Sequence, residues 1–360
     1  MLYRKEEAVA IKGKPIRRRT KGSIRKIAMI IAVSLAGVST AAIISGIIAY
    51  DAFFPRYERP DYAIYPGMYC YERFEGTLKR EILSVRSGEV DLAAYYYPVE
   101  SQKGLVVVVH GMHSGADDYL PIIEAMVKGG YAVFAYDATG NYSSGGESGI
   151  GMCQQLRDLD AVLDFLASSE KYADMPKLLI GHSWGGFSTM CAPLYHPDVA
   201  HLVAISGFVS VDTIQSQIVP FLLAFSRGKL RSVEAKENPS YISSTATEAL
   251  KRTDIPVLII HSVDDKIVSY KKNFLPLKSA LADKENVRFL TVNGKNHSPN
   301  YTDDATKYKD EFFASLKRAA KKKQLETQEQ RNDFVASFDW YRMTEQDEAV
   351  WSHIFNTLDM

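Results

Sequence analysis

The sequence predicts an α/β fold with a mostly parallel, twisted sheet and helices on both of its faces, and three observations predict it. Apolar runs of strand length alternate with longer segments of helical periodicity, which is the pattern of β-α-β units. One run, Leu105–Val109, is apolar at every position, as expected of a strand buried on both faces. Another, Lys177–Ile180, leads directly into Gly181-His182-Ser183-Trp184-Gly185, and a helical run follows.

On the N-terminal side of this pentapeptide we expect a hairpin, two further strands and two helices. Two strand-like runs flank Ser87-Gly88-Glu89, which reads as a tight turn. The second helix carries its leucines at a spacing of three to four residues, so they form one stripe. The expected elements are strands at 77–85, 90–99, 105–109 and 132–136, and helices at 118–128 and 152–167.

On the C-terminal side we expect strands at 202–205, 257–261 and 287–292 and a helix at 270–281. Residues 207–254 interrupt the alternation with mixed helical character and are interpreted as a short helical cap. Residues 303–331 predict a polar helical insertion. A final amphipathic helix is expected to start at Thr344, with a Thr-x-x-Asp capping arrangement to Asp347.

The N-terminal region predicts a membrane anchor. Residues 1–26 hold ten Lys and Arg against two Glu, and the next 24 residues, Ile27–Tyr50, carry no charge. A helix of that length spans roughly 36 Å, enough to cross a bilayer core. The basic flank predicts a cytoplasmic tail and a folded domain outside the cytoplasm. A cleaved signal peptide is the alternative, although its apolar core is ordinarily only about 7–15 residues long.

We therefore expect a single-pass cell-membrane protein in which residues 51–76 connect the membrane helix to a folded domain at 77–360. The basic cluster is assigned to the membrane flank rather than to nucleic acid. Three scattered cysteines do not make a disulfide framework, and Cys191 is expected in the core. The sequence has none of the spacings of a metal or nucleotide site, so we expect no cofactor and no metal.

The pentapeptide is a G-x-S-x-G nucleophile elbow in the strand-to-helix context that gives the pattern its meaning. Glycine at 181 and 185 removes the Cβ atoms that would clash in so tight a turn, which leaves the Ser183 hydroxyl exposed. A serine hydroxyl needs a base to take its proton. His297 follows the expected strand 287–292 directly, at the sheet edge where Ser183 lies, and is the predicted base.

A carboxylate must orient that base, and two adjacent candidates, Asp264 and Asp265, follow the expected strand 257–261. Only one of them can face His297. The spacing to Val268 favours Asp265, with Asp264 capping the turn or facing water. Asp212 is a minor alternative.

The developing oxyanion needs two backbone N–H donors. One is predicted at Trp184, the residue after the nucleophile, and the other at Met112, in the loop His110-Gly111-Met112-His113. His182 is expected to point away from the site. The turn-rich loop that begins at Asp137 reads as a flexible loop or as part of the active-site rim, and no chemistry is assigned to it.

With these motifs the chain resembles the α/β-hydrolase superfamily, in particular its serine-aminopeptidase-like and monoacylglycerol-lipase-like branch with short caps. It is also similar to membrane-anchored hydrolases of Gram-positive bacteria. The resemblance implies a serine hydrolase that needs no cofactor and takes a small-molecule or lipid-like ester. The sequence departs from the family pattern at three places: Ser262 replaces a usual glycine, Ala138-Thr139 stand where Arg-Gly is frequent, and residues 303–331 are inserted before the last helix.

Two alternatives to an esterase stay open. A peptidase or acyltransferase could use the same triad, and an aminopeptidase would need a carboxylate for the substrate amine, for which residues 207–254 offer Asp212, Glu234 and Glu237. A membrane-anchored binding module that kept the fold without catalysis is the second alternative.

Overall fold

The computed structural model describes residues 53–59, 70–219 and 227–360, together with isolated positions between Arg25 and Ile44. The basic tail and the membrane segment Ile27–Tyr50 lie almost wholly outside the described residues. Within the described ranges, no helix combines the length and the apolar character that crossing a bilayer requires. The membrane anchor therefore stays a prediction.

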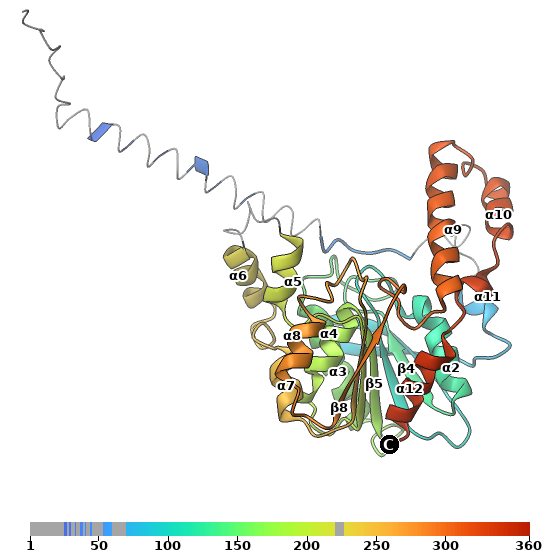
Figure 1. The fold of residues 1–360 in the computed structure, drawn as a ribbon, viewed down its shortest axis with the longest axis horizontal. Helices are drawn as coiled ribbons and strands as arrows, with labels where there is room; N and C mark the ends of the chain where they lie inside the picture. Colours follow the sequence, from blue (N-terminus) through green and yellow to red (C-terminus); the bar gives the residue numbers. More distant parts are fainter. Residues whose placement is uncertain are drawn as a thin grey trace, which may run out of the picture.

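An eight-stranded sheet runs through the centre of the domain (Figure 1). Its strand order is β1-β2-β4-β3-β5-β6-β7-β8, and β2 alone runs antiparallel to its neighbours, which confirms the predicted mostly parallel sheet. The strands are β1 Glu81–Ser87, β2 Val90–Tyr97, β3 Leu105–Val109, β4 Ala132–Tyr136, β5 Lys177–His182, β6 His201–Ile205, β7 Val257–Ser262 and β8 Val287–Val292.

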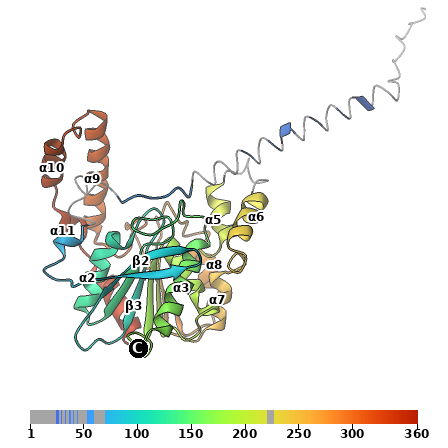
Figure 2. The ribbon, with the colours of Figure 1, turned by 180° about the vertical axis from the view of Figure 1, so that it is seen from behind.

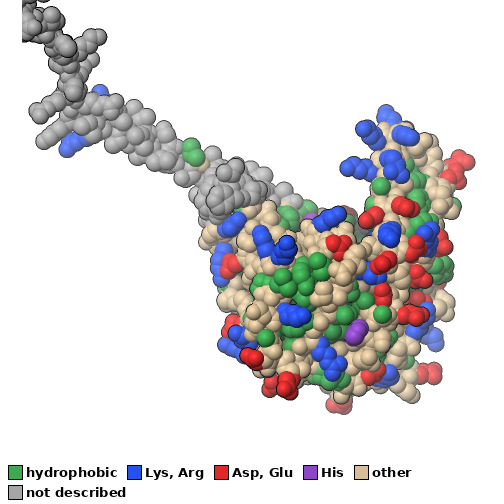
Figure 3. Space-filling view, in the orientation of Figure 1, with side chains coloured by type: hydrophobic (Ala, Val, Ile, Leu, Met, Phe, Trp, Pro, Cys, Tyr) green, Lys and Arg blue, Asp and Glu red, His purple; other side chains and the backbone are tan. Residues whose placement is uncertain are grey.

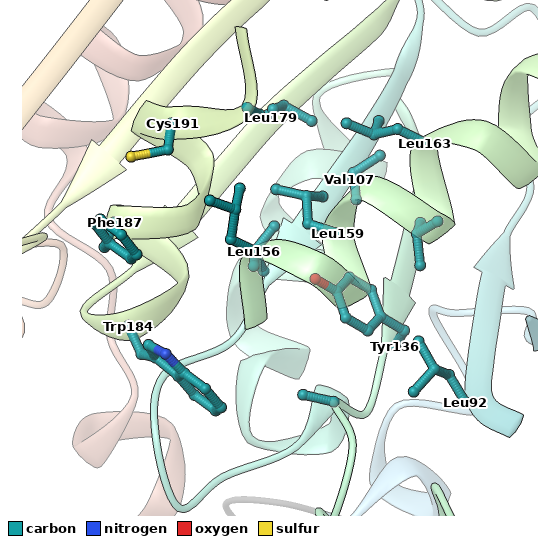
Figure 4. Close-up of a cluster of buried hydrophobic side chains, with 14 of the residues drawn as sticks. Leu92, Val107, Tyr136, Leu156, Leu159, Leu163, Leu179, Trp184, Phe187 and Cys191 are labelled. Carbon is teal, nitrogen blue, oxygen red and sulfur yellow. The ribbon is translucent and has the colours of Figure 1, made fainter. Parts of the chain in front are cut away.

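Helices cover both faces of the sheet, and the side chains of β3 alternate between them. Leu105, Val107 and Val109 join a core cluster with α3 (Gln154–Ser168) and α4 (Trp184–Cys191). Figure 4 shows this cluster, in which Cys191 is buried as predicted. Val106 and Val108 pack on the opposite face, with α2 (Leu120–Lys128) and α12 (Glu348–Leu358). Because successive strand residues point to opposite faces, a strand between two helical layers must be apolar at every position.

The stretch 207–254 contributes three helices in its described part: α5 (Val211–Ile218), α6 (Arg227–Glu237) and α7 (Ala246–Arg252). Ala246 and Leu250 of α7 pack with β6 and β7 in the core, so this end of the stretch belongs to a helical layer. The next helix, α8 (Phe274–Ala280), is shorter than the expected 270–281.

Residues 303–331 are mostly helical, as predicted, but no single helix runs through them. The region forms two helices, α9 (Asp303–Lys321) and α10 (Gln328–Ala336), which make a hairpin that stands away from the sheet (Figures 1 and 2). Phe312 of α9 packs against Phe334 and Phe338, so the two helices bury a small apolar cluster between them. Figure 3 shows Lys and Arg side chains at the free end of the hairpin.

The last helix begins later than expected. Asp347 is its N-cap, and its carboxylate accepts hydrogen bonds from the N–H groups of Ala349 and Val350. Thr344 instead ends the short helix α11 (Trp340–Met343), where its hydroxyl donates to the carbonyl of Trp340. The predicted cap at Thr344 is therefore wrong, because the aspartate three residues later satisfies the free N–H groups by itself.

Residues 53–59 of the connector pack onto the domain beside the loop that follows β4. Tyr57 donates its N–H to Gly140 (2.8 Å) and accepts that of Tyr142 (2.8 Å). The Arg56 guanidinium donates to three carbonyls of the same loop, and Phe54 is buried. This part of the connector is thus built into the folded domain.

Candidate active site

Ser183 sits in the turn between β5 and α4 with φ 57° and ψ −113°. A serine rarely adopts a positive φ, and residues held in this way concentrate at functional sites. The Ser183 N–H donates to the carbonyl of Ile205 (2.8 Å), and its carbonyl accepts from Phe187 (3.1 Å). These two bonds tie the turn to β6 and to the first turn of α4, so the strained backbone is held in place from both sides.

The elbow glycines are required by close backbone contacts. A Cβ on Gly181 would lie 2.3 Å from the carbonyl oxygen of Gly185, and a Cβ on Gly185 would lie 2.1 Å from that of Val109. A Cβ on Gly186 would lie 2.9 Å from the Cα of Gly207. No side chain fits at these distances, so helix α4 can approach the ends of β3 and β6 only with glycine at all three positions.

His297 and Asp265 meet at the carboxyl edge of the sheet. His297 Nδ1 lies 2.8 Å from Asp265 Oδ2, and the Asp265 side chain is fully buried. Asp265 Oδ1 accepts the N–H groups of Ile267 (2.8 Å) and Val268 (2.9 Å), which fixes the carboxylate. Because Nδ1 donates to Asp265, Nε2 is the ring nitrogen of His297 that remains to accept a proton.

The surroundings of Asp265 favour its ionised form. Burial alone would raise the pKa of this carboxyl group, but hydrogen bonds from His261 and His297 and from the backbone outweigh burial and hold the pKa well below its usual range. His261 Nε2 lies 3.2 Å from Asp265 Oδ2 and was not singled out in the sequence. Asp265 therefore remains a carboxylate that can orient the imidazole of His297.

The other two predicted carboxylates do not contact His297. Asp264 accepts the N–H groups of Gly294 (2.9 Å) and Asn296 (3.3 Å), so it ties the turn after β7 to the loop that carries the histidine. Asp212 pairs with Arg231 (2.7 Å) in an exposed ion pair. Among the three candidates, Asp265 is the one brought to His297.

Lys295 anchors the same loop from the other side. Its buried ammonium group contacts the carbonyl of Tyr301 (2.7 Å), Asp347 at the start of α12 (2.7 Å) and Asp303 at the start of α9 (2.9 Å). The position of His297 is thus linked to the first turns of two helices that follow it in the chain.

The predicted oxyanion loop is held beside Ser183. A Cβ on Gly111 would lie 3.4 Å from that of Ser183. His110 is buried, and burial lowers its pKa to about 4, so the ring is neutral. Its Nε2 accepts the N–H of Ala138 (2.8 Å), which leaves the proton on Nδ1, next to the carbonyl of Gly111. The Asp137 carboxylate accepts the N–H of Ala116 (2.7 Å) further along the loop.

The two predicted oxyanion donors are available. Within the described part of the chain, neither the Met112 nor the Trp184 backbone N–H donates to a protein acceptor. Trp184 is the first residue of α4, where the helix leaves its N–H groups without internal partners. Both N–H groups lie in segments that border Ser183, and both remain able to donate to a substrate oxygen.

The expectation that His182 points away from the site is wrong. Its Nε2 lies 2.8 Å from the carbonyl of His297, its Nδ1 lies 2.7 Å from the Tyr119 hydroxyl, and the two imidazole rings are 4.8 Å apart. Burial, together with the charge of the neighbouring His297, lowers the pKa of His182 to about 3. A neutral His182 donates to His297 and accepts from Tyr119, which in turn accepts the N–H of Gly111 (2.8 Å). The oxyanion loop and the histidine loop are joined by this chain of contacts.

Ser183 and His297 open onto one cavity of about 570 Å³. Its other walls come from places that the motifs did not indicate: Phe53 and Tyr57 from the connector, and Lys309 and Phe313 from α9. None of the residues described in 207–254 lines it. A larger hollow of about 830 Å³, between the β1–β2 turn and α3, contains none of the candidate catalytic residues. In the described residues, no three side chains are grouped as a metal site.

The carboxylates that were considered for a substrate amine are likewise elsewhere. Glu234 is buried and accepts the N–H groups of Met152 and Cys153, and Glu237 lies at the surface beside Lys236. With Asp212 paired to Arg231, no member of that set faces the cavity.

The sheet order and the elbow are those of the α/β-hydrolase fold, and comparisons with known proteins find similar chains. Residues 100–247 match the family described as Hydrolase_4, serine aminopeptidase, S33. Over 228 residues the chain is 21% identical to monoglyceride lipase of Rattus norvegicus, covering 54% of this chain and 75% of that protein.

Solved structures show the same fold at low sequence identity. The Pyrococcus furiosus esterase Pf2001 superposes with a TM-score of 0.53 and 16% identity, covering 74% of this chain and 98% of that chain. A second crystal form of that esterase gives a TM-score of 0.51 and 17% identity, covering 66% of this chain and 88% of that chain. This chain therefore has the α/β-hydrolase fold, and its residues 100–247 are similar to the Hydrolase_4 family.

Replacing Gly185 with alanine tests the steric requirement at the elbow. The added Cβ would lie 2.1 Å from a backbone oxygen of β3, so we expect the free energy of unfolding to fall by about 1–3 kcal/mol. The matched control is Gly228→Ala in α6, where nothing lies within 4 Å and the change is expected to be neutral or stabilising by up to about 1 kcal/mol. Urea denaturation of the purified full chain measures both, and equal stabilities for the two variants would contradict the requirement.

Replacing Asp265 with asparagine tests the pKa of this carboxylate. Its folded-state pKa lies below the unfolded value of about 3.9. Its contribution to stability is therefore fully present above that value and is lost as the pH falls through the folded-state pKa. In melting temperatures measured from about pH 7 to about pH 3, the gap between wild type and variant should narrow on the acid side. A constant gap would exclude this account, and the exposed Asp283→Asn is the control.

Proposed function

We propose that this chain is a serine hydrolase that cleaves a carboxylic ester through an acyl-enzyme, with Ser183 as nucleophile, His297 as base and Asp265 as orienting carboxylate. The observation that carries the proposal is the 2.8 Å contact between His297 Nδ1 and the buried Asp265, beside the cavity that Ser183 also lines. A base whose proton-accepting nitrogen is set by a buried carboxylate is the arrangement that activates a serine hydroxyl.

In the acylation step, Ser183 Oγ attacks the ester carbonyl carbon while its proton passes to His297 Nε2. The carbonyl π electrons move onto the oxygen, which the Met112 and Trp184 N–H groups would stabilise as an oxyanion. When the carbonyl re-forms, the bond to the alcohol oxygen breaks, and the imidazolium returns its proton to the leaving alcohol. Asp265 holds the tautomer and stabilises the imidazolium throughout.

Deacylation repeats the sequence with water. His297 takes a proton from the water as its oxygen attacks the acyl carbon, the same N–H groups stabilise the second oxyanion, and Ser183 leaves with the proton returned by His297. The products are a carboxylic acid and the free enzyme, and no group beyond the protein and water takes part.

A small-molecule or lipid-like ester is the substrate class that the cavity supports. Aromatic and aliphatic side chains, among them Phe53, Met112 and Ile122, line much of it. The relatives point the same way, since one is a monoglyceride lipase and another an esterase.

Ser183→Ala tests the nucleophile. Without the hydroxyl no acyl-enzyme can form, so hydrolysis of 4-nitrophenyl butyrate and labelling by a fluorophosphonate probe should both disappear. The full chain is assayed in detergent. Ser188→Ala is the matched control, since Ser188 is buried one turn further along the same helix and should leave labelling intact. Turnover retained in Ser183→Ala would overturn the assignment, and a wild-type chain that neither turns over nor labels would favour a non-catalytic binding module.

A peptidase on the same triad is the second candidate, because residues 100–247 match a family described as serine aminopeptidase. Two carboxylates line the cavity, Asp118 and Glu58, and Glu58 is paired with Arg56 (2.6 Å). Asp118 could meet a substrate amine, but Lys309 lines the same cavity and opposes a cationic group. Comparing an aminoacyl 4-nitroanilide with the butyrate ester separates the two activities. Faster cleavage of the amide would make the peptidase the better description. Transfer of the acyl group to an added alcohol would identify an acyltransferase.

We also propose that residues 27–50 tether the hydrolase to the cell membrane as a single span, with the N-terminus in the cytoplasm and the domain outside. The support is the uncharged 24-residue stretch and its basic flank.

Cell fractionation tests the tether. The full chain should pellet with membranes, resist extraction at alkaline pH and dissolve in detergent, and protease added to intact spheroplasts should reach the domain. Deleting residues 27–50 should move the protein to the soluble fraction. A chain released from the cell and found by N-terminal sequencing to begin after this segment would support a cleaved signal peptide instead.

A further inference from the structure

Helix α9 places a lysine in the cavity of the proposed active site. Lys309 and Phe313 both line this cavity, and they are four residues apart, so they share one face of the helix. The positive charge of Lys309 helps to lower the pKa of His182. His182 in turn contacts the backbone carbonyl of His297. Lys309 thus belongs to the surroundings of the proposed catalytic residues, although it comes from the inserted hairpin.

The first turns of α9 are firmly fixed. Thr302 caps the helix, Asp303 pairs with the buried Lys295 (2.9 Å), and Asp304 binds Arg342 through both of its oxygens. Because Lys295 lies in the loop of His297, the same contact that holds this loop also sets the position of α9. Lys309 lies less than two turns further along, so its side chain has a defined place relative to the catalytic loop.

Lys309 has no counter-ion in the part of the chain that the structure describes. No described carboxylate forms an ion pair with it, and its nearest described partner is the face of the Tyr301 ring, 4.9 Å away. Asp118 and Asp310 attract Lys309 without pairing with it. Glu58, which lines the same cavity, is paired with Arg56 (2.6 Å). Asp118 Oδ2 is already engaged with the N–H of Gly115 (3.0 Å) and the hydroxyl of Tyr142 (2.6 Å).

Both charges are poorly compensated. Burial lowers the pKa of Lys309, and burial raises the pKa of Asp118 to about 7. Lys309 is half-buried. A partly buried cation without an ion-pair partner is unfavourable, and proteins that keep one commonly use it to bind or to react. An anionic group delivered by the substrate would supply the missing partner.

We propose that Lys309 recognises an anionic group, a carboxylate or a phosphate, on the ester that enters the site. Lys309 is then a specificity-determining residue, and the apolar wall that includes Phe313 and Ile122 receives the hydrocarbon part of the substrate. This inference rests on the proposed hydrolase function and narrows its substrate class to anionic esters.

Two pairs of esters test the proposal, and the members of each pair have the same acyl chain length and differ in charge. The carboxylate arm compares mono-4-nitrophenyl glutarate with 4-nitrophenyl pentanoate. The phosphate arm compares 1-butyrylglycerol 3-phosphate with 1-butyrylglycerol. In at least one arm, wild type should prefer the anionic ester in kcat/KM by about tenfold or more, which is what a hydrogen bond between charged groups can provide. The arm that shows the preference identifies the anionic group.

Substitutions at Lys309 should then change the ratio of anionic to neutral kcat/KM. Lys309→Met should lower it about 10- to 100-fold, Lys309→Glu should invert the preference, and Lys309→Arg should largely retain it. Lys307→Met is the matched control, because Lys307 is exposed on the same helix outside the cavity and the ratio should not change. No preference in wild type, or a preference that survives Lys309→Met, would overturn the proposal while leaving the hydrolase assignment standing.

A binding measurement separates the two proposals if no ester is turned over. Glutarate and glycerol 3-phosphate are titrated calorimetrically into Ser183→Ala with and without Lys309→Met. Binding that depends on Lys309 would support anion recognition even where hydrolysis fails. Equal or absent binding in both variants would overturn it.

Discussion

The close approach of helix α4 to the ends of β3 and β6 is the constraint on which the rest of the site depends. The helix starts so near the sheet that even a methyl group on Gly185 would meet the backbone of Val109 at 2.1 Å. This proximity forces Ser183 into its positive φ and turns its side chain toward the edge where the other loops converge. It also places the first N–H groups of the helix beside the serine, where negative charge is favoured. One packing requirement thus sets the position of the proposed nucleophile, its exposure and one proposed oxyanion donor together.

The loops around Ser183 are held by polar groups that keep fixed protonation states. His110 is buried and His182 is half-buried. Both are neutral, and each bonds at both ring nitrogens, so each joins two segments. Asp265 is buried but remains ionised because several donors converge on it. Such a network is stable only when all of its members are satisfied, which gives the loops a rigidity that short turns alone do not have.

The fold and the proposed triad could be predicted from the sequence because their signals are local. Ser183, Asp265 and His297 each follow an apolar strand within a few residues, and parallel strands bring their carboxyl ends to one edge. His182, Lys309 and Phe53 could not be placed in this way. The orientation of His182 depends on its contact with Tyr119. The role of Lys309 depends on how α9 docks beside the cavity, and the polar composition of α9 is the same as that of a helix exposed to solvent. Tertiary contacts of this kind leave no periodic trace in a single sequence.

The two ends of the α9–α10 hairpin differ in how well they should tolerate inserted residues. Its base shares Lys295 with the histidine loop, whereas its tip carries exposed Lys and Arg side chains far from any described contact with the sheet (Figures 1 and 3). Extra residues at the turn 322–327 would lengthen only the outer part of the hairpin, while one residue gained or lost before Lys309 would rotate the cavity-facing side of α9 by roughly 100°. A fluorophore or affinity tag placed at this turn would therefore report on the hairpin without disturbing the register of the helix against the site.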